Sequence, residues 1–440
     1  MAHNSKRAVD LRLGGCSSVA LAHEFGTPLL VIDEAVLRSG MRRFCDAFSR
    51  PGWRCEICYA GKALLLAAVA RTAHDEGLFL DVCSLGELRT ALGAGVPAAR
   101  CVLHGCYKIT EELDAAIEQR VGLIVIDHLE EIEALTERIR RESRASPTPT
   151  SVLLRVNPGI AAQTHGRVQT GAPSSKFGFA ICDGQALSAV KHVALQAGLS
   201  LSGIHCHVGS QIRDLNTYAV EVEQLVAFAA DVKRECGIEL EVFNIGGGLA
   251  TSDLGGDAPT PEAWAAAVFA SLEPRLARAG LKRPTLMIEP GRSLIGPAGT
   301  TIYRIGVRKR LPDGKQALIA DGGMSDNPRP ALYDATYPVT LASRPDASPD
   351  GTYTIFGRHC ETDILFSDVL LANPRPGDLL AVSGTGAYTY AMASNYNRFS
   401  RPAVVFARDG RARLVARRES LEHLLALDVT EEPVQILESS

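Results

Sequence analysis

The chain has 440 residues, of which 46% are hydrophobic and 22% are charged, and its formal net charge at pH 7 is -4. This composition is that of a folded globular protein and argues against nucleic-acid and membrane partners. The sequence has no apolar run of about 18 residues, and its first ten residues are polar. We therefore expect no spanning helix and no secretory leader, and the cytoplasm is the expected compartment.

The 11 cysteines are scattered through apolar segments, so free thiols are expected rather than disulfide bonds. Cys55 and Cys58 have the spacing of a redox or zinc motif, but no second pair completes a site. No metal is therefore predicted.

The elements predicted from residue 53 to residue 290 alternate between short β-rich segments and longer segments of helical periodicity. The β-rich segments are apolar and often β-branched, as parallel strands buried on both faces are. The predicted strands are 55–60, 78–82, 101–104, 123–126, 152–156, 201–205, 242–245 and 286–288, and helical patterns include 63–70, 132–139 and 220–232. Such a series of βα units predicts an α/β protein with a (β/α)8 barrel.

The remaining elements predict a second domain. Hairpin patterns follow the barrel, at 303–310 with 317–320 and at 404–408 with 412–415. A strand at 29–32 precedes the barrel and is expected to join this β domain. The predicted organisation is an N-terminal segment at 1–30, a barrel at 31–295 and a C-terminal all-β domain at 296–440. Residues 157–180 form a long loop that we expect to cover the barrel's site.

A polar residue, or in one case a run of glycines, stands at the carboxyl end of every predicted barrel strand, where the site of such a barrel is built. In chain order they are Lys62, Ser84, His104, Asp127, Arg155, His207, Gly246 to Gly248 and Glu289. Because strand ends are solvated and turns favour Gly, Asp and Ser, each position alone has a purely structural interpretation. Their agreement across all the strands predicts one site at this rim.

Three of these positions suggest a chemistry. A desolvated lysine such as Lys62 can form Schiff bases with carbonyl compounds. The bare backbone amides of Gly246 to Gly248 can approach a phosphate, and a carboxylate such as Glu289 can keep a pyridine nitrogen protonated. Each has a structural alternative. Lys62 would be a solvated surface charge, the glycines would form a tight turn, and Glu289 would form an ion pair with Arg292.

His205 and His207 lie two residues apart and so share one face of a strand, as metal ligands can. The sequence offers no obvious further ligands for them. The preferred interpretation is that His207 stacks on a flat cofactor ring with Ser210 near its phosphate. The alternative is a hydrogen-bonded core histidine.

Ordered motifs over roughly residues 25–425 make the resemblance to one family specific. They are YAGKA at 59–63, RVNPG at 155–159, SKFG at 175–178, GIHCHVGSQI at 203–212, GGGL at 246–249, EPGRS at 289–293, DGGMSD at 321–326, RPALY at 329–333, CETD at 360–363 and GAY at 386–388. In this order they resemble those of the diaminopimelate decarboxylases, pyridoxal-phosphate-dependent enzymes of fold-type III, the alanine-racemase-like fold.

The resemblance implies that the cofactor is pyridoxal 5'-phosphate. Lys62 would hold it covalently, His207 would stack on its ring and Glu289 would pair with its nitrogen. The other residues that the resemblance places around the cofactor are Ser210, Gly246, Gly247, Gly248, Gly291, Arg292 and Tyr388.

The implied activity is decarboxylation of an amino acid, most specifically of meso-diaminopimelate at its D-configured centre to give L-lysine and CO2. Arg292, Arg329 and Tyr333 would hold the distal carboxylate, Glu361 would hold the distal ammonium, and Tyr388 would contact the substrate. The family also implies a homodimer whose partner subunit delivers Cys360 and Glu361, with Cys360 protonating the carbon that has lost CO2. A buried Cys360, and surface roles for Arg329 and Tyr333, are the structural alternatives.

The chain departs from the family at Leu85, at Cys106 and Tyr107, and at 250–253 and 336–338, all near the predicted barrel mouth. The first alternative is therefore a related decarboxylase of secondary metabolism that accepts another amino acid, including a D-configured or modified one. A racemase would need a second base on the opposite ring face, commonly a tyrosine. A non-catalytic decarboxylase-like binding protein would have lost Lys62 or its surroundings.

Overall fold

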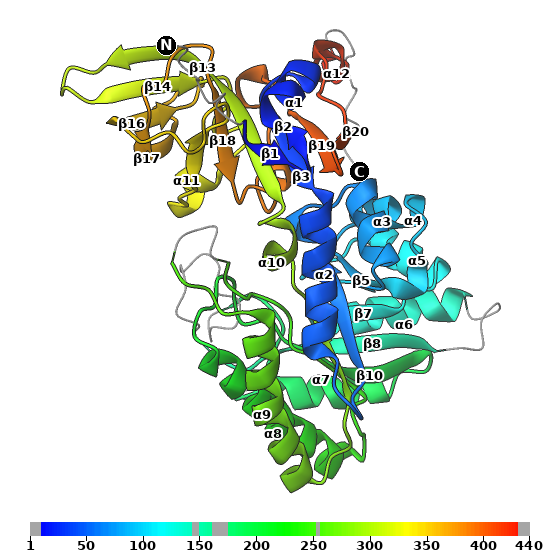
Figure 1. The fold of residues 1–440 in the computed structure, drawn as a ribbon. Helices are drawn as coiled ribbons and strands as arrows, with labels where there is room; N and C mark the ends of the chain where they lie inside the picture. Colours follow the sequence, from blue (N-terminus) through cyan, green and yellow to red (C-terminus); the bar gives the residue numbers. More distant parts are fainter. Residues whose placement is uncertain (1–9, 143–148, 161–174, 252–255, 430–440) are drawn as a thin grey trace, which may run out of the picture.

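The computed structural model describes residues 10–142, 149–160, 175–251 and 256–429. Figure 1 shows two lobes, a barrel surrounded by helices and a smaller β lobe, with helix α2 (Glu34–Phe48) running from one to the other. The described residues contain no helix whose length and apolar character would let it cross a membrane.

The barrel is a closed ring of eight parallel strands. They are β4 (Cys55–Ala60), β5 (Phe79–Val82), β6 (Cys101–Leu103), β7 (Leu123–Ile126), β8 (Thr150–Asn157), β10 (Leu199–His205), β11 (Val242–Asn244) and β12 (Thr285–Ile288). Parallel pairings of β8 with β10 and of β12 with β4 close the ring, while the short β9 (Phe179–Ala180) pairs with β8 outside it. The predicted barrel and its strands are confirmed, with small differences at the strand ends.

Side chains alternate between the two faces of each barrel strand, and this alternation explains which residues fill the barrel interior. Tyr59, Leu103 and Leu154 belong to the large core between strands and helices, whereas their neighbours Cys58, Val102 and Leu153 form a separate buried cluster. Because successive strand residues point to opposite faces, the second cluster fills the barrel interior. The side chains of Cys55 and Cys58, three residues apart on β4, accordingly point to opposite faces and cannot share a site. All 11 cysteines are free thiols.

The helices that cover the barrel follow its strands in order. They are α3 (Ala67–Asp75), α4 (Leu85–Gly93), α5 (Thr110–Glu118), α6 (Leu129–Glu142), α7 (Gln185–Ala194), α8 (Asn216–Cys236) and α9 (Pro261–Ala279). The helical patterns at 132–139 and 220–232 lie within α6 and α8, as predicted.

The helix predicted at 63–70 begins later than expected. Residues 61–63 form a 3-10 turn and α3 starts only at Ala67. The carbonyl of Ala63 accepts from the Tyr388 amide at 2.8 Å, and that of Leu64 accepts from the Tyr59 hydroxyl at 2.8 Å. Because these tertiary partners bind the carbonyls that a helix would use, the segment after Lys62 stays irregular.

The β lobe is built on β3 (Leu29–Asp33) and the long β13 (Gly299–Arg310). Its further strands are β14 (Gln316–Ala320), β15 (Val339–Leu341), β16 (Gly351–Phe356), β17 (Ile364–Leu371), β18 (Leu379–Ser383), β19 (Ala403–Arg408) and β20 (Arg411–Ala416), and a small pair, β1 (Arg12–Leu13) and β2 (Cys16–Ser17), precedes helix α1 (Ser18–Phe25). β13 pairs with β14 and β19 pairs with β20, both antiparallel, so both predicted hairpins are confirmed. β3 lies between β13 and β19, and the N-terminal strand therefore joins the β domain as predicted.

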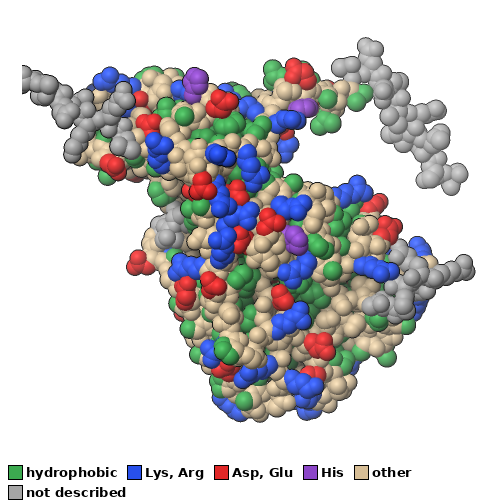
Figure 2. Space-filling model, turned by 45° about the vertical axis from the view of Figure 1, so that its right-hand side comes forward, with side chains coloured by type: hydrophobic (Ala, Val, Ile, Leu, Met, Phe, Trp, Pro, Cys, Tyr) green, Lys and Arg blue, Asp and Glu red, His purple; other side chains and the backbone are tan. Residues whose placement is uncertain are grey.

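Charged side chains connect the two lobes. Figure 2 shows basic and acidic side chains side by side at the waist between them. Glu34, the first residue of α2, lies 2.9 Å from Arg38 of the same helix and 3.3 Å from Arg413 of β20. The short helix α10 (Arg292–Ile295) leads the chain from the barrel back into the β lobe, so the lobes are joined near the ends of both β3 and β12.

Candidate active site

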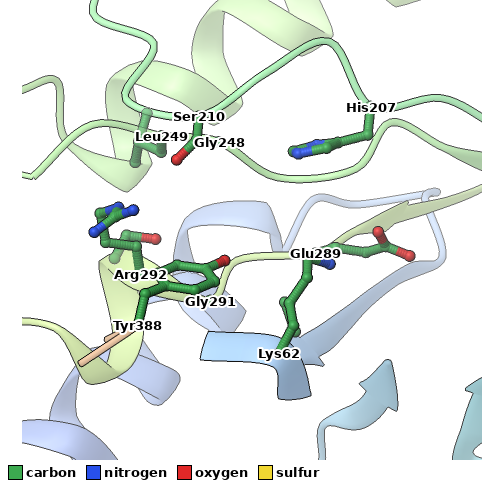
Figure 3. A pocket seen from close by; sticks show the side chains of 11 residues that line it. Lys62, His207, Ser210, Gly248, Leu249, Glu289, Gly291, Arg292 and Tyr388 are labelled. Carbon is green, nitrogen blue, oxygen red and sulfur yellow. The ribbon is translucent and has the colours of Figure 1, made fainter. Parts of the chain in front are cut away.

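Two adjoining cavities lie at the carboxyl ends of the barrel strands, and Lys62, His207 and Glu289 line both. The first cavity, which Figure 3 shows, is also lined by Ser210, Gly248, Leu249, Gly291, Arg292 and Tyr388. The second is lined by residues that include Asp81, Cys83, His104, Cys106, Tyr107, Arg155, Lys176, Phe177 and His205. The structure therefore gathers most of the predicted site residues at one rim.

Lys62 projects into the cavities from the turn after β4 (Figure 3). Its Nζ lies 2.6 Å from Oδ2 of Asp81, a fully buried residue of β5. Burial opposes the lysine charge, but Asp81, Tyr388 and Glu289 together raise the pKa of Lys62 above its usual value. Asp81 is not among the site residues predicted from the sequence, although a single aspartate within an apolar strand indicates that a cation must pair with it.

Glu289 follows β12 and is buried among three polar side chains. Its Oε1 accepts from Asn244 Nδ2 at 2.7 Å and lies 2.9 Å from His104 Nε2, and its Oε2 lies 3.1 Å from His205 Nε2. Burial alone would raise the pKa of Glu289, but the two histidines hold it well below its usual value. Glu289 is therefore a carboxylate aimed at the cavity, rather than the Arg292 ion-pair partner considered as its structural alternative.

His205 and His207 have different environments although they share a strand face in the sequence. Burial lowers the pKa of His205 to about 4, with Glu289 opposing the shift. Burial, Lys62 and Arg155 lower the pKa of His207 well below its usual value, and its Nδ1 accepts from the Gly247 amide at 3.2 Å. His207 is consequently a neutral, oriented ring at the cavity edge, and it faces Lys62 from the opposite side in Figure 3.

The glycines after β11 keep backbone close to the cavity. A Cβ on Gly247 would lie 2.1 Å from the Glu289 carbonyl oxygen, and one on Gly248 would lie 2.1 Å from the Gly209 carbonyl oxygen. Gly246 and Gly248 also have φ of +63° and +98°, which L-residues with a side chain seldom adopt. Only glycine therefore fits these positions, and a Cβ on Gly291 would likewise lie 2.9 Å from the Ala60 Cβ.

These features test whether pyridoxal phosphate fits. Lys62 supplies an amine, Glu289 a carboxylate for a ring nitrogen, and His207 a neutral flat ring. Ser210, Arg292 and Tyr388 gather at the other end of the cavity, beside the glycines (Figure 3). A hydroxyl, a guanidinium and exposed backbone suit a phosphate. The residues fit the cofactor that the sequence resemblance implies.

Two arginines and two tyrosines form an adjacent cluster. The guanidinium of Arg292 lies 4.7 Å from the ring centroid of Tyr388, and that of Arg329 lies 4.6 Å from Tyr333 and 5.6 Å from Tyr388. Arg292 and Arg329 are both buried, and among the described residues Arg329 Nε has no hydrogen-bond partner. The structure thus places all four predicted substrate-binding residues of this group together beside the first cavity.

Cys360 and Glu361 lie on another segment, where Glu361 lines a further cavity together with Pro330 and Ala331. Neither lines the two cavities at Lys62 of their own chain, and Cys360 is exposed. Their segment is held in place by the pairing of His359 Nδ1 with Asp363 Oδ2 at 2.6 Å and by a hydrogen bond from the Cys360 amide to Asn397 at 3.1 Å. Glu361 accepts from the Tyr396 hydroxyl at 2.6 Å.

Not every polar strand end belongs to the site. The Ser84 side chain caps α4 by accepting from the Glu87 amide, and Asp127 accepts from the Gly178 amide at 3.0 Å. These two residues stabilise turns, as their structural interpretation proposed. Most of the covering loop predicted at 157–180 lies outside the described residues, although Lys176 and Phe177 line the second cavity.

Comparisons with known proteins agree with this geometry. Residues 34–296 match the family model described as pyridoxal-dependent decarboxylase, pyridoxal binding domain. The chain is 42% identical to a diaminopimelate decarboxylase of Bacillus subtilis over 421 residues, 95% of each chain, and 43% identical to one of Actinosynnema pretiosum over 424 residues, 96% of this chain and 93% of the other. The crystal structure of diaminopimelate decarboxylase from M. jannaschii in complex with L-lysine matches with a TM-score of 0.87 at 30% identity over 94% of each chain.

Proposed function

The chain belongs to the diaminopimelate decarboxylase family of pyridoxal-dependent decarboxylases, and on that premise we propose that it converts meso-diaminopimelate into L-lysine and CO2. The observation that carries the proposal is the position of Lys62 between a buried acidic partner, the Glu289 carboxylate and a glycine cradle. In this reaction the bond from the α carbon to its carboxylate breaks, the electron pair stays on carbon, and a proton replaces the lost group.

The cofactor is pyridoxal 5'-phosphate. In the proposal Lys62 holds it through Nζ, Glu289 pairs with its ring nitrogen, and His207 stacks on the ring. Ser210, Arg292, Tyr388 and the backbone of Gly246 to Gly248 and Gly291 surround its phosphate. When bound, the cofactor supplies an electron sink for the charge left on the α carbon.

Asp81 is the residue we propose to handle the proton of Lys62. The lysine must lose a proton from Nζ before it can act as a nucleophile, and Asp81 Oδ2 lies 2.6 Å away. Because the same carboxylate also stabilises the charged amine, it orients Nζ within the cavity. His207, held neutral beside Lys62, adds no competing positive charge.

The buried arginines account for the choice of a diacid. Arg292 and Arg329 present guanidinium groups beside Tyr333 and Tyr388, and a planar guanidinium can bind a carboxylate with two parallel hydrogen bonds. In the proposal this cluster binds the distal carboxylate of the substrate. A substrate without that carboxylate would leave buried positive charge uncompensated.

We further propose a homodimer in which the partner subunit completes each site. Cys360 is an exposed thiol next to Glu361, and neither residue reaches the cavities at Lys62 of its own chain. The rigid pairing of His359 with Asp363 presents this segment as a fixed surface feature. In the proposal Cys360 delivers the proton to the α carbon of the neighbouring site, and Glu361 binds the distal ammonium there.

The domain limits and the compartment also remain proposals. We propose domains at 1–30, 31–295 and 296–440, because the chain passes between the lobes near β3 and at α10. The cytoplasm is the proposed compartment, which the free state of all the cysteines supports, since thiols stay reduced there.

A second candidate function is decarboxylation of a different amino acid. Cys106 and Tyr107, two departures from the family pattern, line the second cavity, and the Tyr107 side chain is 76% exposed. Side chains in such positions can change which substrates enter while the cofactor site stays intact.

The test of both candidates is CO2 release from meso-diaminopimelate, D- and L-lysine, D- and L-ornithine, and arginine. We expect release from the diacid, with L-lysine as the product. Arg329→Lys keeps the charge but removes the planar fork, so it should raise KM for the diacid about 10-fold or more. Activity on a monocarboxylic diamino acid but not on the diacid would refute the main proposal in favour of the second.

A further inference from the structure

His104, His205 and Glu289 converge in the wall of the second cavity, although their strands are not neighbours in the ring. His104 follows β6, His205 ends β10 and Glu289 follows β12. All three are buried, and one ligand atom of each lies within 4.8 Å of the other two. In the part of the chain that the structure describes, this is the one group of three or more metal-capable side chains at such distances.

Hydrogen bonding does not fully account for the cluster. His104 Nε2 lies 2.9 Å from Glu289 Oε1, yet this buried nitrogen has no hydrogen-bond partner among the described residues. The two groups are therefore close without the alignment that a hydrogen bond needs. This close but poorly aligned pair leaves His104 Nε2 available to share a metal ion with the Glu289 carboxylate.

The spacing suits a metal ion. Zinc bonds to imidazole nitrogen and carboxylate oxygen are about 2.0–2.2 Å long, which in a tetrahedral site separates adjacent ligand atoms by about 3.3 Å. Glu289 Oε1 lies 2.9 Å from His104 Nε2, and its other oxygen, Oε2, lies 3.1 Å from His205 Nε2, so each carboxylate oxygen faces one imidazole. Small movements would bring the three groups onto one ion. The Asn244 amide, which donates to Glu289 Oε1 at 2.7 Å, already fixes the carboxylate as an outer-shell partner would.

The fourth position of such a site is open. All three side chains line the second cavity, together with Lys62 and Asp81, so a bound ion would face solvent from there. Asp81 Oδ1 lies 4.0 Å from His104 Nε2 and could hold a water on the ion or become a ligand itself. Two imidazoles and one carboxylate with an open position form a set that favours Zn²⁺, Co²⁺ or Ni²⁺ over Mg²⁺ and Ca²⁺.

We propose that the chain without its cofactor binds one divalent transition-metal ion, Zn²⁺ or a similar ion, at His104, His205 and Glu289. The ion and pyridoxal phosphate exclude each other, because both require the Glu289 carboxylate. The exclusion rests on the proposed role of Glu289 toward the cofactor, whereas the binding of the ion does not.

The first experiment titrates the full-length cofactor-free chain with Co²⁺, whose absorption spectrum reports tetrahedral coordination, and then displaces it with Zn²⁺ in a calorimeter. We expect one ion per chain and no competition from Mg²⁺. His104→Ala and Glu289→Gln should each weaken Zn²⁺ binding about 100-fold or more. Glu289→Gln keeps the size and the Asn244 contact, so its loss of binding is not a folding defect, and circular dichroism checks this for both variants.

His207→Ala is the matched control, because it removes a histidine that lines the same cavity but is not in the cluster. It should bind Co²⁺ as the unaltered chain does. Absence of a tetrahedral Co²⁺ spectrum, or equal Co²⁺ affinity in His104→Ala, would overturn the proposed site.

The second experiment tests the exclusion without measuring catalysis. Cofactor-free protein preloaded with Zn²⁺ should take up pyridoxal phosphate, followed by its absorbance, far more slowly than metal-free protein, and a chelator should restore the rate. The cofactor-loaded protein should bind no Co²⁺. Equal Co²⁺ binding by the loaded and cofactor-free proteins would overturn the exclusion, and it would do so even if the metal site itself were confirmed.

Discussion

The barrel rim and the segment around Cys360 differ in their relation to the site. The rim residues meet their partners within one chain, whereas Cys360 does not reach the site of its own chain. At the rim, Lys62, Asp81 and Glu289 contact partners supplied by other strands of the same barrel. Cys360 instead lies exposed on a rigid segment that does not reach those cavities. If the proposed dimer is right, cofactor binding is a property of one barrel, and turnover needs the Cys360 surface of a second subunit.

The largest effect is expected from Lys62→Ala. Removing the only proposed anchor should reduce turnover by a factor of more than about 10⁴, since nucleophile deletions have effects of this size. Borohydride reduction followed by mass spectrometry should find the cofactor on Lys62 in the unaltered protein and on no residue in the variant. Lys176→Ala, which removes another lysine of these cavities, should leave the label in place. Finding the reduced cofactor on a lysine other than Lys62 would contradict the proposal that the residues of the barrel rim form the cofactor site.

Cys360→Ala should lower turnover without lowering cofactor binding, and so distinguish the Cys360 segment from the barrel rim. Loss of a proton donor typically lowers turnover by a factor of about 10²–10⁴. Because Cys360 does not line the cavities of its own chain, cofactor content and absorbance should stay unchanged. Cys182→Ala, which removes another exposed thiol, is the control and should retain full turnover. An equal loss of cofactor and activity would show that the thiol has a structural role instead.

A smaller effect concerns how pH acts on the β lobe. Burial raises the pKa of Asp326 to about 7, although the Tyr303 hydroxyl and the Gly323 amide donate to it. A carboxyl whose folded pKa exceeds its unfolded value stabilises the fold at low pH, and that contribution is lost as pH rises from about 4 to about 7.

Asp326→Asn should therefore flatten the decline in unfolding free energy between those pH values by a few kcal/mol at most. The measurement is urea unfolding of the unaltered protein and the variant at matched pH. If the free energy of unfolding depends on pH identically in the two proteins, Asp326 does not cause the loss of stability between about pH 4 and about pH 7.

The fold could be predicted because local patterns determine it. Each barrel strand is a short apolar segment with a polar residue at its end, and the hairpins carry their turn residues with them. The partners of the site residues could not be predicted in the same way. His104, His205 and Glu289 follow or end three strands that are not neighbours in the ring, so only closure of the barrel brings all three together.

The late start of α3 has a similar cause. The segment after Lys62 has a helical pattern, but Tyr388 and Tyr59 bind its carbonyls from elsewhere in the molecule. The assignment of Cys360 to a partner subunit depended on resemblance alone, because nothing in the spacing of residues 360–363 indicates which chain they serve.

The most direct test of the central claim mixes two inactive variants, Lys62→Ala and Cys360→Ala. If each site combines Lys62 of one chain with Cys360 of another, random reassociation makes half of the dimers mixed, and each mixed dimer holds one intact site. The mixture should then recover about one quarter of the unaltered activity. A mixture that exchanges subunits yet remains as inactive as its components would contradict the shared site.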